Sequence, residues 1–204
     1  MKKNKRYRNT NKNSTRYLVK NKSREEHMIY LDYAATTPVN DEVLQTYFSA
    51  ANKYWGNPNS LHDFGSDANN VVQAAKKKIK TLFDAEDYEI IFTGGATEAN
   101  NLAIKGICEK KAHKGKHIVT TAIEHTSVYN TFLYLEKKGF EVTFLNVDVE
   151  GRINVEDLKK IIRDDTILVS IMCVNNEIGT IMPIASCGTL LKQMPQVSFH
   201  VDFA

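Results

Sequence analysis

The chain has 204 residues, of which 42% are apolar and 25% are charged, with a formal net charge of +3 at pH 7. This composition is ordinary for a globular protein large enough for one domain with a core, and it excludes a wholly disordered chain. We find no secretory leader and no apolar run of about 18 residues or more, so we expect neither export nor a membrane span.

The first 27 residues are much more basic than the rest. They hold ten of the 27 Lys and Arg residues but only two acidic residues, Glu25 and Glu26. Because residues 1–27 are rich in Lys, Asn and Ser and lack an apolar period, we expect a disordered tail. We favour Met28 as the true start, with the tail an upstream artefact. A transit peptide stays open, and so does contact with nucleic acid or an anionic surface, which we do not favour.

From residue 67 onward, helical and strand patterns alternate. Apolar residues at a 3.6 period predict helices, and short apolar runs predict buried strands. The expected strands are 89–93, 117–121, 141–147, 166–172 and 197–202, and the expected helices start near 67, 96, 126, 155 and 184. This alternation predicts an α/β fold, with a mostly parallel sheet and helices on both faces. We see no linker to a second domain, so residues 28–204 are expected to form one.

Ligands of such sheets bind at the carboxyl ends of the strands. There, "TGGATEANN" (93–101) places two glycines before a helix whose first turn holds Ala96 and Thr97. Free backbone N–H groups and the helix dipole favour a phosphate or carboxylate at this position. A tight turn with a Thr cap explains the same residues equally well.

Three more polar positions follow predicted strands. His125 has the simpler explanation of a helix cap, and the pair Asn175 and Asn176 that of a turn. Asp202 lies near the tip of an apolar strand, where a carboxylate without a cation is costly, so we expect a protonated ring nitrogen or an arginine beside it. An anion seat, an imidazole, an amide and a carboxylate on one rim are the groups that pyridoxal phosphate requires.

Six motifs, in order, resemble those of the cysteine desulfurases, in the class V aminotransferase group of fold-type I pyridoxal phosphate enzymes. They are "IYLDYAATTPV", "GNPNSLHDFG", "IIFTGGATEANNLAIKG", "EHTSV", "DDTILVSIMCVNNEIGT" and "FHVD". The resemblance runs from Met28 to Ala204 and implies part of the large domain of that fold. "LDYAATTP" and "VNNEIG" are most similar to the branch that serves iron–sulfur cluster assembly and tRNA thiolation.

The resemblance also implies roles for individual residues. Ala96 and Thr97 are implied to bind the cofactor phosphate, and His125 to stack on the pyridine ring and take part in proton transfer. Asn176 is implied to donate to the ring oxygen, and Asp202 to pair with the pyridinium nitrogen. The implied reaction converts L-cysteine to L-alanine, and an enzyme cysteine takes the sulfur as a persulfide for an acceptor protein. A cytoplasmic homodimer without a metal is expected for the full-length family.

Two residues that the resemblance implies have no match in this chain. One is the Schiff-base lysine, expected downstream of "FHVD", and the other is the nucleophilic cysteine of a later loop. Cys108, Cys173 and Cys187 are far apart in apolar segments, which indicates buried, unreactive thiols and a reducing compartment. We therefore expect an inactive fragment of about half the family's length, prone to aggregate through an uncovered sheet edge.

Two other functions stay open. One is an inactive α/β module that binds a partner or dimerises. The other is a related pyridoxal phosphate enzyme, such as selenocysteine lyase or an aminotransferase, because the cysteine loop that distinguishes these activities has no match.

Overall fold

The computed structural model describes residues 29–204, so the predictions for the basic tail, residues 1–27, lie outside the described residues. The chain divides into two units, the first ending at Ala51 and the second covering Asn52–Ala204. The prediction of a single domain over 28–204 stays a prediction. Among the described residues, every helix is too short or too polar to cross a membrane.

Helix α1 (Asp41–Lys53) is one that the apolar pattern does not predict. Its start is fixed locally, because Asn40 Oδ1 accepts a hydrogen bond from the backbone N–H of Glu42 at 2.9 Å. Acidic residues in its first turn and a lysine in its last turn suit the helix dipole. None of its residues is buried. The cap and the charges at its two ends therefore support this helix locally.

Helix α2 (Asp63–Leu82) is the predicted helix near residue 67, and it begins four residues earlier. His62 caps it, because its Nδ1 accepts from the backbone N–H of Gly65 at 3.3 Å. A side chain at Gly65 would meet the Ser60 carbonyl oxygen at 2.3 Å, so only glycine fits this close turn.

The predicted strand at 89–93 is wrong, because this segment has no regular structure and Ile91 and Phe92 are exposed. A strand needs a neighbour for its N–H and C=O groups, and none of the strands within residues 29–204 pairs with this one. An apolar run predicts burial, but it does not supply a pairing partner.

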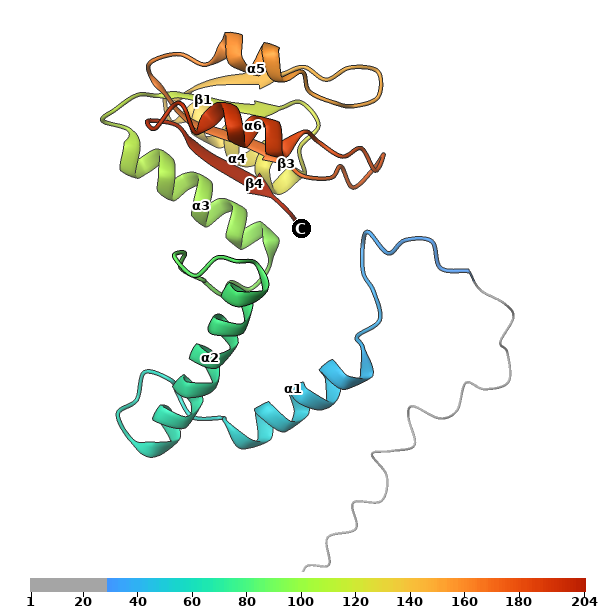
Figure 1. Ribbon diagram of the computed structural model, residues 1–204, viewed down its shortest axis with the longest axis vertical. Coiled ribbons are helices and arrows are strands. Elements are labelled where there is room, and N and C mark those ends of the chain that lie inside the picture. The colour runs from blue at the N-terminus through green and yellow to red at the C-terminus, as the bar shows by residue number, and fades with distance from the viewer. Residues whose placement is uncertain (1–28) are drawn as a thin grey trace, which may run out of the picture. The chain divides into compact units, whose positions relative to one another are not determined.

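The sheet has four strands: β1 (His117–Thr121), β2 (Glu141–Leu145), β3 (Thr166–Met172) and β4 (Ser198–Asp202). All are parallel, in the order β2-β1-β3-β4 (Figure 1). Consecutive strands are joined through helices, as parallel pairing requires. The predicted α/β class is confirmed.

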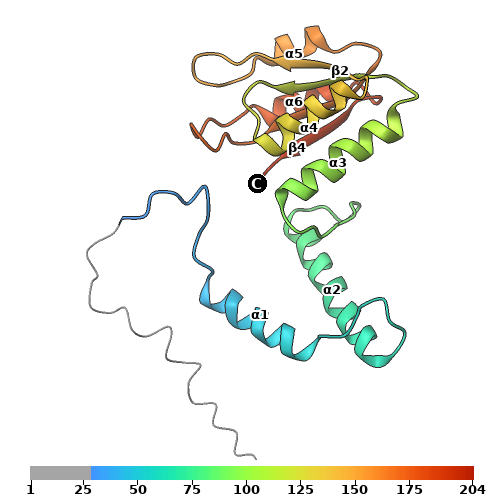
Figure 2. The ribbon, with the colours of Figure 1, turned by 180° about the vertical axis from the view of Figure 1, so that it is seen from behind.

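Helices cover both faces of the sheet. Helices α3 (Ala96–Lys111) and α4 (Thr126–Lys137) pack on one face, which can be seen in Figure 2, the view of the molecule from behind. Helices α5 (Val155–Ile161) and α6 (Ile184–Leu191) pack on the other face (Figure 1). The prediction of helices on both faces is therefore confirmed.

Two buried clusters fill the space between sheet and helices. The cluster under α3 and α4 consists of Ile104, Cys108, Ile118, Val128, Phe132, Leu135, Ile167 and Leu168. The cluster under α5 and α6 consists of Val119, Leu145, Ile153, Leu158, Val169, Ile171, Met182, Cys187, Leu191 and Val197. Each large aliphatic or aromatic side chain removed from water contributes about 1.5–3 kcal/mol. The buried sheet thus forms a rigid base for the residues that follow its strands.

Candidate cofactor site

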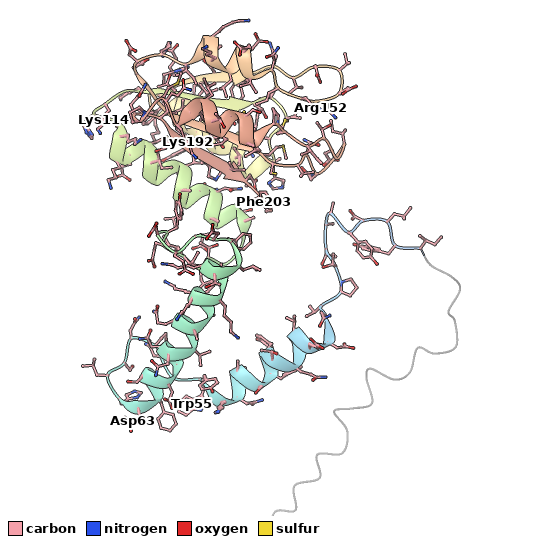
Figure 3. All side chains as sticks on the ribbon, viewed as in Figure 1. Trp55, Asp63, Lys114, Arg152, Lys192 and Phe203 are labelled. Atoms are coloured by element: carbon pink, nitrogen blue, oxygen red, sulfur yellow. The ribbon has the colours of Figure 1, made fainter. Side chains whose placement is uncertain are left out.

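The ends of the four parallel strands meet at one edge of the sheet, called here the carboxyl edge. In the β-ladder, Thr121 pairs with Leu145 and Met172 pairs with Asp202. Phe203, labelled in Figure 3, directly follows β4 and is exposed. The residues that the sequence predicts for a site lie in the segments next to this edge.

Asp202 is a buried carboxylate, with 8% of its surface exposed. Its Oδ2 accepts from Asn100 Nδ2 at 2.9 Å and its Oδ1 accepts from the backbone N–H of Ala204 at 3.2 Å. The alternative of an arginine partner is not found, since no lysine or arginine within residues 29–204 forms an ion pair with Asp202. Neutral donors alone hold this acid, which leaves it suited to a cationic ligand.

A chain of hydrogen bonds, called here the Asp202 network, links Asp202 to His125. Asn100 Nδ2 also donates to Ser127 Oγ at 3.0 Å, and Ser127 Oγ lies 2.8 Å from His125 Nδ1. Both N–H groups of the Asn100 amide are therefore in use. Because Ser127 Oγ accepts from Asn100, its hydroxyl hydrogen is available for His125 Nδ1.

His125 caps helix α4, which is the simpler explanation given by its position after β1. Its Nδ1 accepts from the backbone N–H of Ser127 at 3.2 Å. Since Nδ1 accepts, the neutral ring carries its proton on Nε2. The residue is exposed at the carboxyl edge. Capping fixes the imidazole at one nitrogen and leaves the other free for a ligand.

Ala96 and Thr97 form the exposed first turn of α3, after Gly95 as the N-cap. Glu98 Oε2 accepts from the backbone N–H of Gly94 at 2.6 Å. Because Glu98 takes the N–H of Gly94, an anion at this helix end would use the N–H groups of Ala96 and Thr97 instead.

Thr97 and Ser127 line the same hollow of about 340 Å³ between α3 and α4. This hollow places Thr97 beside one member of the Asp202 network.

Asn176 lies beyond β3 and is exposed, with its Nδ2 donating to Glu177 Oε1 at 3.0 Å. None of the hydrogen bonds found in residues 29–204 joins it to the Asp202 network. Its neighbour Asn175 is buried, and its Nδ2 donates to the Ile123 carbonyl at 2.9 Å. The structure therefore places Asn176 in the loop at the carboxyl edge without bringing its side chain to the other candidates.

Sequence reasoning missed Asn100 and Ser127, which join the predicted residues. Asn100 lies one helical turn after Thr97 in "TGGATEANN", and Ser127 lies two residues after His125 in "EHTSV". Both are buried polar side chains. The available signal was a polar residue on the inward face of each helix.

The cysteines are only partly as expected. Cys108 and Cys187 are buried, and desolvation raises the pKa of Cys108 to about 12 and that of Cys187 to about 11. The expectation of a buried thiol is wrong for Cys173, which is only half-buried. It directly follows β3, where the packed part of the sheet ends, and its backbone N–H donates to the Asp202 carbonyl at 2.7 Å.

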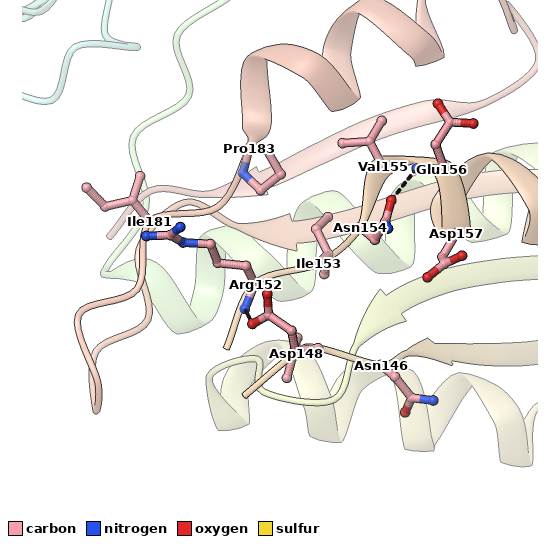
Figure 4. A pocket seen from close by; sticks show the side chains of 11 residues that line it. Asn146, Asp148, Arg152, Ile153, Asn154, Val155, Glu156, Asp157, Ile181 and Pro183 are labelled. Carbon is pink, nitrogen blue, oxygen red and sulfur yellow. Dashed lines mark hydrogen bonds between the residues drawn. The ribbon is translucent and has the colours of Figure 1, made fainter. Parts of the chain in front are cut away.

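A larger hollow of about 780 Å³ lies beyond β2 and contains none of the predicted site residues (Figure 4). Asp148 Oδ1 there accepts from the backbone N–H of Arg152 at 2.9 Å. Asn154 Oδ1 accepts from the backbone N–H of Glu156 at 2.8 Å. These polar side chains stabilise a turn and a helix start, so they give no sign of a ligand.

The parallel sheet with helices on both faces agrees with the fold expected of a class V aminotransferase. The chain belongs to this family, described as "Aminotransferase class-V", which matches residues 29–204. Within the family its relatives are cysteine desulfurases. It is 51% identical over 175 residues to a "NifS/IcsS protein homolog" of Lactobacillus delbrueckii subsp. bulgaricus, covering 86% of this chain and 46% of the relative. It is 47% identical over 174 residues to the cysteine desulfurase IscS of Dictyoglomus turgidum, covering 85% of this chain and 44% of the relative.

Solved structures give the same assignment. A "NIFS-LIKE PROTEIN" superposes with a TM-score of 0.82 at 38% identity, covering 86% of this chain and 49% of that one. "SspA in complex with cysteine" superposes with a TM-score of 0.80 at 38% identity, covering 85% of this chain and 50% of that one. The chain thus spans about half the length of the relatives it matches.

Proposed function

We propose that the carboxyl edge forms the cofactor-binding part of a cysteine desulfurase that depends on pyridoxal 5′-phosphate. The observation that carries this proposal is the burial of Asp202 with neutral donors only, joined to His125 through Asn100 and Ser127. A buried carboxylate without a cation fits the protonated nitrogen of a pyridine ring. Membership of the class V aminotransferase family supports the choice of cofactor.

Pyridoxal phosphate, when bound, supplies an electron-withdrawing ring that lets the Cα of an amino acid lose its proton. Asp202 would hold the proton on the ring nitrogen, while Asn100 and the backbone N–H of Ala204 donate to its two oxygens and fix the carboxylate in place. His125 would lie against the ring and would exchange a proton through Nε2, because its Nδ1 accepts from the Ser127 backbone N–H.

The remaining candidates bind the other ends of the cofactor. Ala96 and Thr97 bind the phosphate through backbone N–H groups and the Thr97 hydroxyl. Asn176 donates to the ring oxygen, for which its amide must leave Glu177. These assignments rest on the resemblance together with the position of each residue near the carboxyl edge.

For the whole protein we propose the conversion of L-cysteine to L-alanine, with the sulfur carried as an enzyme persulfide to an acceptor in iron–sulfur cluster assembly or tRNA thiolation. A structural relative is described in complex with cysteine, which supports this substrate. We further propose a cytoplasmic homodimer.

None of the three cysteines is assigned as the sulfur-carrying nucleophile. Cys108 and Cys187 are buried with raised pKa values, so they do not supply a thiolate at neutral pH. Cys173 is half-buried directly after β3, where its backbone N–H donates to the backbone carbonyl of Asp202. With no match to the Schiff-base lysine either, we propose that this 204-residue chain by itself is inactive as a desulfurase.

The test is binding of pyridoxal phosphate to the 204-residue chain, measured by equilibrium dialysis. Asp202→Asn keeps the shape but removes the charge, and we expect it to weaken binding by about tenfold or more, since hydrogen bonds to charged groups contribute about 1.5–3 kcal/mol. Asp157→Asn is the matched control, because Asp157 is exposed and paired only with Lys160 at 2.6 Å. Absence of binding to the unmodified chain would contradict the proposal and leave an α/β binding or dimerisation module as the function.

A further inference from the structure

Glu124 is a buried acid to which the proposed function gives no role. It lies between β1 and α4, immediately before His125, and is only 9% exposed. Its Oε1 accepts from Thr121 Oγ1 at 2.7 Å and from the backbone N–H of Met172 at 3.0 Å. Its Oε2 is fully buried and has no hydrogen-bond partner. An acid in this position needs an explanation.

The first part of the explanation is geometric. Met172 is the last residue of β3, and the ladder between β1 and β3 extends only as far as Val119 and Val169. The Glu124 carboxyl therefore supplies the acceptor for the Met172 N–H that the backbone of β1 does not supply. Asn175 adds a second link between the same segments, because its Nδ2 donates to the Ile123 carbonyl at 2.9 Å. The turn that bears His125 is thus tied to the end of β3.

The second part is electrostatic. Burial, with a smaller contribution from the charge of Asp202, raises the pKa of Glu124 to about 7 against the opposing effect of the two hydrogen bonds to Oε1. Asp202 on β4 is the charged group that acts on Glu124. Further titratable side chains of the adjoining segments are His125 on the same turn, His200 on β4, and Cys173 and Glu177 after β3. Burial lowers the pKa of His200, so it adds no positive charge near neutrality. The carboxyl of Glu124 is therefore protonated in mildly acidic solution.

We propose that Glu124 is a positioning residue, whose buried carboxyl fixes the turn bearing His125 against the end of β3. This role depends only on the geometry of this chain.

The pH dependence of unfolding tests, without any cofactor, whether the Glu124 carboxyl is buried and protonated in the folded chain. The folded pKa of Glu124 is raised above its ordinary value of 4.5 to about 7, so its neutral form stabilises the fold fully below pH 4.5 and this stabilisation is lost as the pH rises through 7. Between pH 4.5 and 8 we expect the folded-to-unfolded ratio to fall roughly 100-fold more in the unmodified chain than in Glu124→Gln. Urea titrations at several pH values measure this.

Thr121→Val is the matched control, because it removes one hydrogen bond to Oε1 and keeps the carboxyl. That bond lowers the pKa, so the control keeps the pH dependence and shifts it to higher pH. Equal pH dependence in the unmodified chain and Glu124→Gln would overturn the proposal. Unfolding of Glu124→Gln at pH 5 would do so too, because glutamine reproduces the neutral acid.

Amide hydrogen exchange tests the positioning of His125. The Met172 amide bonds to Glu124, and the Ser127 amide bonds to His125. We expect Glu124→Ala to speed exchange at both amides at least about tenfold relative to Val169 in the middle of β3, and Glu124→Gln to restore slow exchange. Unchanged exchange at Ser127 would show that Glu124 does not hold the His125 turn. The urea experiment still decides the proposal if Glu124→Ala does not fold.

Discussion

Residues 96–204 and residues 29–95 of this chain both contain helices with apolar side chains, but only the first group buries large ones, since Ala68 is the one buried apolar residue of the second. Phe132 of α4 is fully buried against the sheet, whereas Tyr47 of α1 and Trp55 are mostly exposed. The difference is the sheet, because a helix gains stability chiefly by packing its apolar face against another element. The free energy of folding of the described residues therefore comes mainly from 96–204.

The largest loss of stability is expected from a substitution in the core of residues 96–204. Phe132→Ala should lower the free energy of unfolding by about 3–5 kcal/mol, because it opens a cavity between α4 and the sheet. Tyr47→Ala, on the exposed face of α1, should change it by less than about 0.5 kcal/mol. Urea unfolding followed by circular dichroism measures both. Similar losses in the two variants would show that α1 contributes to the same core.

The next effect concerns the buried polar network rather than the apolar core. Asn100→Ala removes the amide that donates to both Asp202 and Ser127, so a buried carboxylate loses its side-chain donor. We expect the free energy of unfolding to fall by about 2–3 kcal/mol, and binding of pyridoxal phosphate to weaken.

Asn69→Ala is the control for Asn100→Ala, because Asn69 on α2 accepts only from Gln73 at an exposed position. Its expected effect is below about 0.5 kcal/mol. Equal losses of stability in Asn100→Ala and Asn69→Ala would mean that Asp202 does not depend on the Asn100 amide.

The contrast between buried and exposed apolar residues also explains which elements could be predicted from the sequence. Strand β3 is predicted to the residue, because all its residues are buried and both faces are apolar. The strand predicted at 89–93 fails for the opposite reason. Its apolar residues have no paired neighbour within residues 29–204, and a one-dimensional pattern does not contain pairing.

The candidate site shows a similar limit. The rule that ligands bind at the strand ends of an α/β sheet predicts His125 and Asp202 as site residues. In the structure, the Asp202 network connects these two residues. The connecting residues escaped prediction because their contacts are long-range: Asn100 and Asp202 are 102 positions apart, and Asn100 and Ser127 are 27 apart. The resemblance gave Asn176 a role, but the structure leaves its amide bonded to Glu177, so that role stays a proposal.

The smallest loss of stability is expected within residues 29–95, at the start of α1. Asn40→Ala removes the cap that accepts from Glu42, and caps of this kind contribute about 0.5–2 kcal/mol to their own helix. Because no residue of α1 is buried, this loss should appear as lower helix content and faster amide exchange over 41–44, with unchanged exchange in β1 and β3. Asn40→Asp, which keeps a capping oxygen, should restore the helix. Faster exchange throughout the sheet in Asn40→Ala would instead mean that α1 and the sheet unfold as one cooperative unit, and the division of stability between the two regions would be wrong.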